Sequence, residues 1–354
     1  MIYQYLQKNK QYNLPNGSDY LENLKKINIF VWSNNAWKSR FLRDVFLSDE
    51  NSIVFYDEDY NSNLLKIIEL LPEKHKDLYF WKELKNLTNS KTGNYWLRYN
   101  QLMTNIYNST TRSNGTWNVW DSEIAESIRS AINTLGNIPI ELPVIHNKPK
   151  FVYIPILRGI RQIDLSSEKI DEKKDLYKLR TRLDYNFSFE EGAIWNKEIF
   201  SWASIYRDIR KMLLWSKDSR KFVKNFEDFL SENFFQNKPI TLIPDHDTDS
   251  IKINIGNGED RKIHDVGDGI QSIIISTFPA FSYQEEDLIL CIEEPEMTMH
   301  PSIQRILIDT LVKFPNLQVF LTTHSNHFLD LSYDYPDKIG IFSFEKNDED
   351  DEFY

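Results

Sequence analysis

Residues 28–42, NIFVWSNNAWKSRFL, join a strand-like apolar run to a polar turn and the start of a helix. Lys38 and Ser39 stand at the offsets of a phosphate-binding loop with the pattern G-x-x-x-x-G-K-[ST]. In such a loop backbone N–H groups surround the phosphates, the lysine contacts them and the hydroxyl binds Mg²⁺. Both glycine positions are tryptophan here, Trp32 and Trp37. The stretch predicts a strand–loop–helix unit that has the layout of a nucleotide site without its glycines.

The composition is that of a chain with a large core and an acidic surface. Of the 354 residues 41% are hydrophobic, and no apolar run reaches the roughly 18 residues of a membrane span. The first residues do not resemble a secretory signal, and the single cysteine, Cys291, has no partner, so we expect a cytoplasmic protein without membrane contact. A net charge of −11 disfavours nucleic acid over the surface as a whole.

Three strongly charged stretches stand out against this background. Residues 173–182 and 207–224 are locally basic, and residues 347–352, NDEDDE, are acidic. Each basic stretch is a candidate for nucleic-acid contact, although a solvated helix face is the simpler interpretation of both. The acidic stretch is expected to be a frayed end.

The order of predicted elements favours an α/β fold. Residues 60–135 are mostly helical and polar in pattern, 150–157 predict a buried strand, and 199–235 form a long amphipathic helical pattern. Short strands follow near 240–243 and 251–255, with a hairpin signal at residues 256–258, GNG. Strand and helix patterns then alternate over 287–292, 301–314, 317–322 and 338–344. Such alternation predicts a mainly parallel sheet.

Polar groups follow two of these apolar strands. In residues 287–301, DLILCIEEPEMTMHP, a fully apolar strand ends at Glu293 and Glu294, whose side chains we expect to point in opposite directions. In residues 317–325, LQVFLTTHS, a second apolar strand ends at His324. Ligands of open α/β sheets bind at the carboxyl ends of the strands, so these groups predict a site there. For each motif taken alone, the simpler structural alternative is a charged strand end that faces solvent and binds nothing.

A glycine-rich turn precedes a long apolar helix in residues 264–278, HDVGDGIQSIIISTF. The free backbone N–H groups at the start of that helix predict an anion site. With the three motifs above, in this order, the chain resembles the ABC-class ATPase heads of the overcoming-lysogenization-defect (OLD) group and its AAA-family relatives, which are similar to chromosome-maintenance ATPases. The resemblance implies a P-loop NTPase fold, with a head formed by residues 1–60, 140–165 and 236–354. Residues 61–139 and 166–235 would form a mainly helical insertion.

The resemblance also assigns roles to individual residues. Lys38 would contact the β- and γ-phosphates of ATP, Ser39 and Glu293 would hold Mg²⁺, Glu294 would position or deprotonate the attacking water, and His324 would be the switch histidine. The remaining loop positions are Trp32, Ser33, Asn34, Asn35, Ala36, Trp37 and Arg40. The signature segment, which covers the nucleotide of another subunit in this class, would be Gly267, Asp268, Gly269 and Gln271. A homodimer or higher homo-oligomer of heads is therefore implied.

The two tryptophans set this chain apart from that class. A β-carbon at a position of positive φ costs roughly 1–2 kcal/mol, and an indole in the phosphate cradle adds a steric penalty. Three explanations stay open: a natural pseudo-ATPase, an altered version of an active enzyme, or a loop of another shape that still binds nucleotide. Whether the chain is an enzyme is thus undecided from sequence.

The function that the resemblance implies is that of an ATPase subunit in a prokaryotic anti-phage defence system. ATP binding or hydrolysis would gate a separate effector, such as a toprim nuclease or a toxin, in response to DNA or a phage protein. Few residues follow His324, so we expect either that the effector is a separate polypeptide or that the chain has been cut short. The alternatives are a catalytically dead scaffold for effector assembly and a DNA repair or end-processing ATPase.

Overall fold

The structure is a computed structural model that describes residues 2–6, 20–21, 24–32, 35–48, 53–56, 149–156, 181–182, 197–245 and 250–344. The chain forms two compact units, residues 1–24 with 48–148 and residues 25–47 with 149–354. In the first unit β1 (Ile2–Leu6), β2 (Tyr20–Leu21) and β4 (Ile53–Tyr56) form an antiparallel sheet of order β2-β1-β4. The candidate site lies wholly in the second unit.

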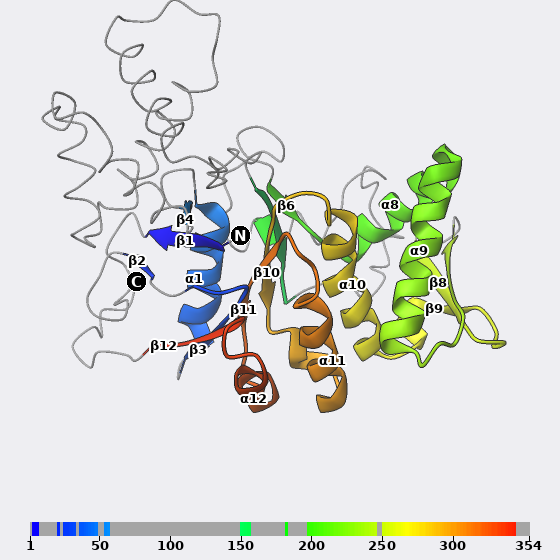
Figure 1. Ribbon diagram of the computed structural model, residues 1–354. Coiled ribbons are helices and arrows are strands. Elements are labelled where there is room, and N and C mark those ends of the chain that lie inside the picture. Colours follow the sequence, from blue (N-terminus) through cyan, green and yellow to red (C-terminus); the bar gives the residue numbers. More distant parts are fainter. Residues whose placement is uncertain are drawn as a thin grey trace, which may run out of the picture. The chain divides into compact units, whose positions relative to one another are not determined.

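A six-stranded sheet is the framework of the second unit (Figure 1). Its strands are β3 (Ile27–Trp32), β5 (Lys150–Ile154), β6 (Lys197–Ile199), β10 (Leu288–Glu293), β11 (Leu317–Thr322) and β12 (Ile339–Phe344). The spatial order is β12-β3-β11-β10-β5-β6, and every neighbouring pair is parallel. Parallel strands are covered on both faces, which explains the continuous apolar runs of β10 and β11. The predicted α/β fold with a mainly parallel sheet is confirmed.

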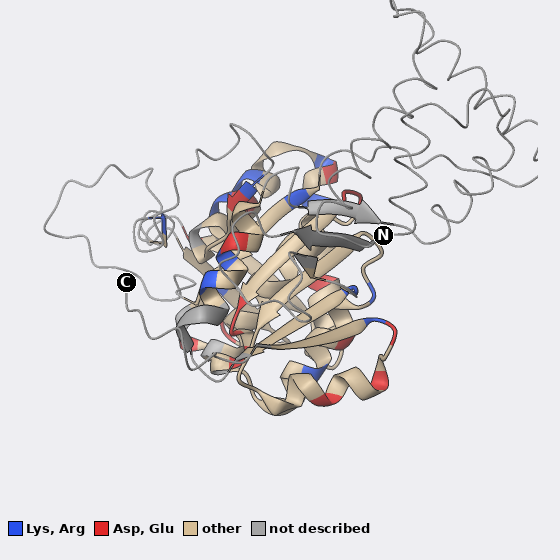
Figure 2. Ribbon diagram, turned by 90° about the vertical axis from the view of Figure 1, so that its left-hand side faces the viewer, with Lys and Arg blue, Asp and Glu red and all other residues tan. Residues whose placement is uncertain are grey.

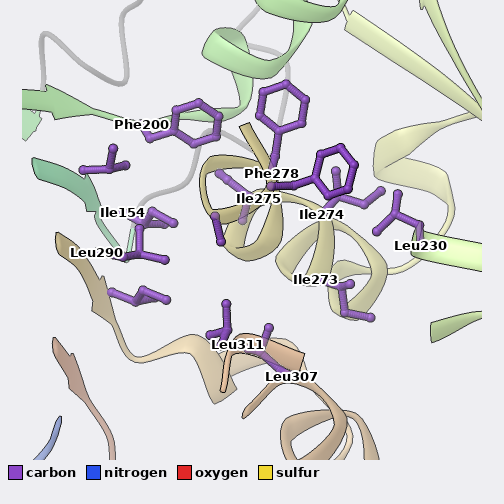
Figure 3. Packing of buried hydrophobic residues seen from close by; sticks show 14 of the residues in the cluster. Ile154, Phe200, Leu230, Ile273, Ile274, Ile275, Phe278, Leu290, Leu307 and Leu311 are labelled. Carbon is purple, nitrogen blue, oxygen red and sulfur yellow. The ribbon is translucent and has the colours of Figure 1, made fainter. Parts of the chain in front are cut away.

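The two faces of the sheet pack different side chains. One face is aliphatic and contacts α10 (Asp268–Ser282), α11 (Pro301–Leu311) and α12 (Asn326–Asp334). Figure 3 shows part of this cluster, with Ile154 and Leu290 of the sheet facing Ile275 of α10. The other face is largely aromatic and packs on α1 (Asn35–Leu47), through ring pairs such as Phe30–Phe41 at 4.9 Å. Successive side chains of a strand point to opposite faces, which separates the aliphatic face from the aromatic face. The same alternation determines whether a residue at a strand end faces α1 or the helices of the aliphatic face.

Two helices replace the single long pattern predicted over residues 199–235. α8 (Trp202–Trp215) and α9 (Lys217–Phe234) meet at Ser216, whose hydroxyl accepts a hydrogen bond from the Ser219 N–H at 3.1 Å. Ser216 is therefore the N-cap of α9, and its extended backbone breaks the helix. Both helices contribute to the aliphatic core, for example through an edge-to-face contact of Phe226 with Phe278. The division of the chain into an ATPase head and a helical insertion stays a prediction.

A small antiparallel sheet completes the second unit, formed by β7 (Ile240–Asp245), β8 (Ser250–Ile255) and β9 (Arg261–Lys262). Gly256, with φ of 69°, begins the turn between β8 and β9, as the GNG signal predicts. Most charged residues lie on helices and connections, and the long strands of the central sheet are mainly tan in Figure 2. None of the described helices combines the length and the apolarity that crossing a membrane requires.

Candidate nucleotide site

The predicted motifs meet at the carboxyl ends of three adjacent strands. β11 lies between β3 and β10, with Thr322 paired to Phe30 on one side and to Glu293 on the other. α1 begins at Asn35, shortly after β3 ends at Trp32. The end of the phosphate-loop strand, the acidic pair and the histidine therefore lie along one edge of one sheet, the position at which open α/β folds bind ligands.

Glu293 is the last residue of β10, and its side chain is buried. Strand alternation directs it to the same side as Cys291, the face covered by α1. One carboxylate oxygen accepts a hydrogen bond from the Ile156 N–H at 3.1 Å, and the other lies 3.8 Å from Nη1 of Arg43 in α1. Glu293 thus ties β10 both to the segment after β5 and to the helix that carries Lys38 and Ser39.

Glu294 adopts a left-handed backbone conformation, with φ of 39° and ψ of 61°. This conformation costs a non-glycine residue about 1–2 kcal/mol. It is stabilised by the Glu294 N–H, which donates to the carbonyl oxygen of Thr322 at 3.0 Å and to the Thr322 hydroxyl at 3.3 Å. The turn separates the directions of the two glutamates, as alternation predicts, and leaves the Glu294 carboxylate partly exposed at the sheet edge.

His324 faces Glu294 across the ends of β10 and β11. Its Nε2 atom lies 3.6 Å from Oε1 of Glu294, and the two side chains are 44% and 15% exposed. A carboxylate beside an imidazole, both open to solvent, can accept a proton and hold a water molecule or a phosphate oxygen between them. The sequence prediction that these two residues share one site agrees with this geometry.

Glu296 holds the histidine from the other side and received no role from the sequence. Its Oε1 atom accepts a hydrogen bond from the His324 N–H at 2.6 Å. The next residue, Ser325, caps α12 and donates its hydroxyl to Oε1 of Gln304 at 2.6 Å. The backbone around His324 is therefore fixed by η3 (Pro295–Thr298) and α11. The acidic run EEPE is the sequence signal that could have pointed to this residue.

The phosphate-loop side is described only in part. Ser33 and Asn34 lie outside the described residues, and of Trp32 and residues 35–38 the structure gives the backbone alone. Ser39 is half-buried and Arg40 is exposed. Ser39 precedes Arg43 by four residues, so the two lie on one face of α1, the face that approaches Glu293.

The oxygen donors present fit the expected Mg²⁺. Glu293 supplies a buried carboxylate, Ser39 supplies a hydroxyl on the helix face turned toward it, and Mg²⁺ prefers such oxygen ligands together with phosphates and waters. Elsewhere in the described part of the chain, no group of three or more His, Cys, Asp or Glu residues forms an all-protein metal cage. A site that shares its ion with a nucleotide is consistent with this donor set.

The signature segment begins α10 as predicted. Gly267 is the N-cap, with φ of 92°, a conformation that favours glycine. Gly267 is exposed and Gly269 is half-buried, but the Gln271 side chain is fully buried, and that of Asp268 lies outside the description. The glycines are therefore accessible to a partner, whereas Gln271 packs inside the unit. That the segment covers a nucleotide of another subunit stays a prediction.

These features define the class of protein. A parallel α/β sheet and a strand–loop–helix unit with Lys38 and Ser39 at P-loop offsets are consistent with the fold of a P-loop NTPase. That the acidic strand end and the histidine facing it form the nucleotide site of such a protein stays a prediction. At the level of families, residues 158–330 match the model described as "AAA domain, putative AbiEii toxin, Type IV TA system".

The match covers just under half of the chain. It contains α10, β10, β11 and His324, while β3 and α1 lie before it. The matched model describes an AAA domain, in agreement with the expected relation to AAA-family ATPases. The narrower OLD-like, ABC-class assignment stays a prediction. No curated protein matches the chain.

Proposed function

We propose that this chain belongs to a prokaryotic defence system as an ABC-type, OLD-like ATPase subunit that gates a separate effector such as a toprim nuclease or a toxin, with a phosphate loop that Trp32 and Trp37 compromise. The observation that carries the proposal is the 3.6 Å approach of His324 to Glu294 beside the helix that follows β3. The description of the matching family, which names an abortive-infection toxin and a type IV toxin–antitoxin system, supports the defence context.

Each residue has a distinct task in this proposal. Lys38 binds the β- and γ-phosphates, Ser39 and Glu293 hold the metal, and Glu294 orients the attacking water or takes its proton. His324 holds the γ-phosphate edge of the site and reports whether that phosphate is present. Bound Mg²⁺ supplies charge neutralisation for the phosphates. Glu296 keeps the His324 backbone in place, and Thr322 keeps the Glu294 backbone in place.

A switch role follows from the connections of these residues. His324 leads directly into α12 through the Ser325 cap, and Glu294 leads into η3, which leads into α11. A nucleotide that moves either side chain therefore acts on helices of the aliphatic core. We place the effector's control there, in a homo-oligomer of heads that responds to DNA or to a phage protein.

Binding of ATP decides between an enzyme and a scaffold. Trp32 and Trp37 occupy the glycine positions and favour the second candidate, a catalytically dead assembly scaffold. The test is an equilibrium titration of the chain and of the double variant Trp32→Gly, Trp37→Gly with a fluorescent ATP analogue and Mg²⁺, followed by phosphate release. We expect the variant alone to bind tightly and to turn over. Equal affinities would refute the claim that the indoles block the cradle.

The third candidate function, DNA repair or end processing, predicts a different experimental result. Turnover of the glycine-restored variant would then rise in the presence of DNA, with an affinity that falls steeply as salt increases. If DNA does not change the ATP turnover of this variant, DNA repair is excluded and the defence role remains.

A further inference from the structure

The elbow between α8 and α9 carries unpaired positive charge on an acidic protein. Residues 207–224, called the elbow below, contain seven Lys or Arg residues and two Asp residues, in a chain of net charge −11. Arg207 pairs with Asp208 and Glu198, and Lys224 pairs with Asp228. The other five, Arg210, Lys211, Lys217, Arg220 and Lys221, form no ion pair among the described residues. Such a concentration of uncompensated charge attracts an anionic partner.

Large apolar side chains are exposed at the same place. Trp215 is 76% exposed and Leu214 is 69% exposed at the end of α8. The Nζ atom of Lys211 lies 5.8 Å from the centre of the Trp215 ring, in cation–π geometry. An indole exposed to this extent, surrounded by cations, is typical of a recognition surface rather than of a solvated helix.

A cavity of about 420 Å³ lies beside this indole. Its walls include Phe200, Met212, Trp215, Phe278, Ser282 and Tyr283. The hydroxyl oxygen of Ser282 is buried and makes no hydrogen bond within the described part of the chain. The cavity has the size of a binding pocket and offers aromatic walls with one unsatisfied polar atom. It suits an aromatic ring that bears a hydroxyl group.

The chain itself contains a segment of matching chemistry. Residues 345–354, EKNDEDDEFY, carry six carboxylates followed by Phe353 and Tyr354. The six carboxylates, less the charge of Lys346, carry a net charge of −5, opposite in sign and equal in size to that of the five unpaired cations. A tyrosine ring matches the aromatic walls, and its hydroxyl matches Ser282.

The pocket and the origin of that segment lie toward opposite edges of the sheet. The segment leaves from the carboxyl end of β12, on one edge. Tyr283 in the pocket lies under Lys150, the first residue of β5, and Phe200 follows β6 on the opposite edge. Five strand spacings separate β12 from β6, about 24 Å in a straight line through the core. Ten residues span at most about 35 Å, too little to pass around the covering helices.

We propose that residues 345–354 of one copy dock on the elbow of a second copy, with Tyr354 in the pocket and the carboxylates along α8 and α9. Reciprocal exchange of this segment between two copies closes a two-fold dimer. The contact is independent of nucleotide and of the proposed function. It gives the protein a self-association surface apart from the ATPase site.

Two measurements test the proposal. The first is the solution mass by light scattering for the whole chain and for a variant that lacks residues 345–354. We expect a concentration-dependent dimer for the former and a monomer for the latter, whose fold is checked by circular dichroism. The second is fluorescence anisotropy of a labelled EKNDEDDEFY peptide titrated with the shortened variant. We expect saturable binding that weakens as salt increases.

Matched variants identify the surface. Lys217→Glu with Lys221→Glu should weaken peptide binding about tenfold or more, while Lys313→Glu with Lys338→Glu, the same charge change elsewhere, should change it less than about twofold. Trp215→Ala and a peptide with Tyr354→Ala should each weaken it about tenfold.

Three results would overturn the proposal. They are a mass that does not depend on residues 345–354, equal binding of a scrambled peptide of the same composition, and a peptide that fails to bind. If a single-stranded oligonucleotide binds the elbow through Lys217 and Lys221 while the peptide does not, the surface serves nucleic acid instead.

Discussion

Nε2 of His324 lies 3.6 Å from Oε1 of Glu294, although the two residues end different strands. The approach depends on the left-handed turn at Glu294, which swings its carboxylate away from the buried position of Glu293. Two adjacent glutamates are thereby given separate environments, one buried against α1 and one open beside the histidine. The same turn is tied to Thr322, so the histidine strand also shapes the acidic strand's end.

The open glutamate should carry the chemistry. In the Trp32→Gly, Trp37→Gly background, Glu294→Gln keeps the shape but loses the proton acceptor, so we expect unchanged ATP affinity and phosphate release slower by about 10²–10⁴-fold. Single-turnover assays with radiolabelled ATP measure this. The matched control is Glu286→Gln, an exposed carboxylate in the turn before β10, which should retain full turnover. A Glu294→Gln variant as fast as its parent would remove Glu294 from the mechanism.

The hydrogen bond from the His324 N–H to Glu296 should stabilise the fold and place the imidazole. Glu296→Ala removes the acceptor of that solvent-exposed N–H and should lower the free energy of unfolding by about 0.5–1.5 kcal/mol, whereas Glu296→Gln keeps an acceptor oxygen and should lose less. Urea unfolding followed by circular dichroism measures both. If the glutamine variant is as unstable as the alanine variant, the carboxylate acts in some way other than through this bond.

Arg43 should be required for the stability of the buried Glu293 carboxylate. Arg43→Ala leaves that charge without its neighbouring cation, and we expect a loss of about 2–4 kcal/mol. Lys221→Ala, at an exposed site on α9, is the stability control and should cost less than about 0.5 kcal/mol. Adding Glu293→Gln to Arg43→Ala should restore most of the loss, and the absence of any restoration would mean that Arg43 stabilises α1 by packing alone.

Glu227 in α9 should make stability depend on pH. Burial raises the pKa of this carboxyl, partly opposed by the hydrogen bond that it accepts from the Leu242 N–H at 2.7 Å. Because the folded state holds the proton more tightly than the unfolded state, the contribution of Glu227 to stability is greatest at low pH. It declines as pH rises from about 4.5 through the raised pKa. Glu227→Gln should flatten this decline between pH 4.5 and 7 in urea unfolding. An unchanged profile would contradict the assignment.

The sequence by itself determined the α/β class and the edge at which the site lies. Apolar strands of β10 and β11 are buried on both faces, and only a covered parallel sheet allows that, so their polar ends had to meet at one edge. The different directions of the Glu293 and Glu294 side chains followed from the alternation of strand side chains. These are local regularities, and they can be read along the chain.

Only the tertiary structure decided which groups surround those ends. The bond from His324 to Glu296, the approach of Arg43 to Glu293 and the tie between Glu294 and Thr322 join segments far apart in the sequence. The burial of Gln271 and the break at Ser216 were likewise decided by packing and by a cap that the helical pattern of residues 199–235 concealed. Periodicity specifies which face of an element is buried, but the neighbour that covers it depends on how strands are ordered across the sheet.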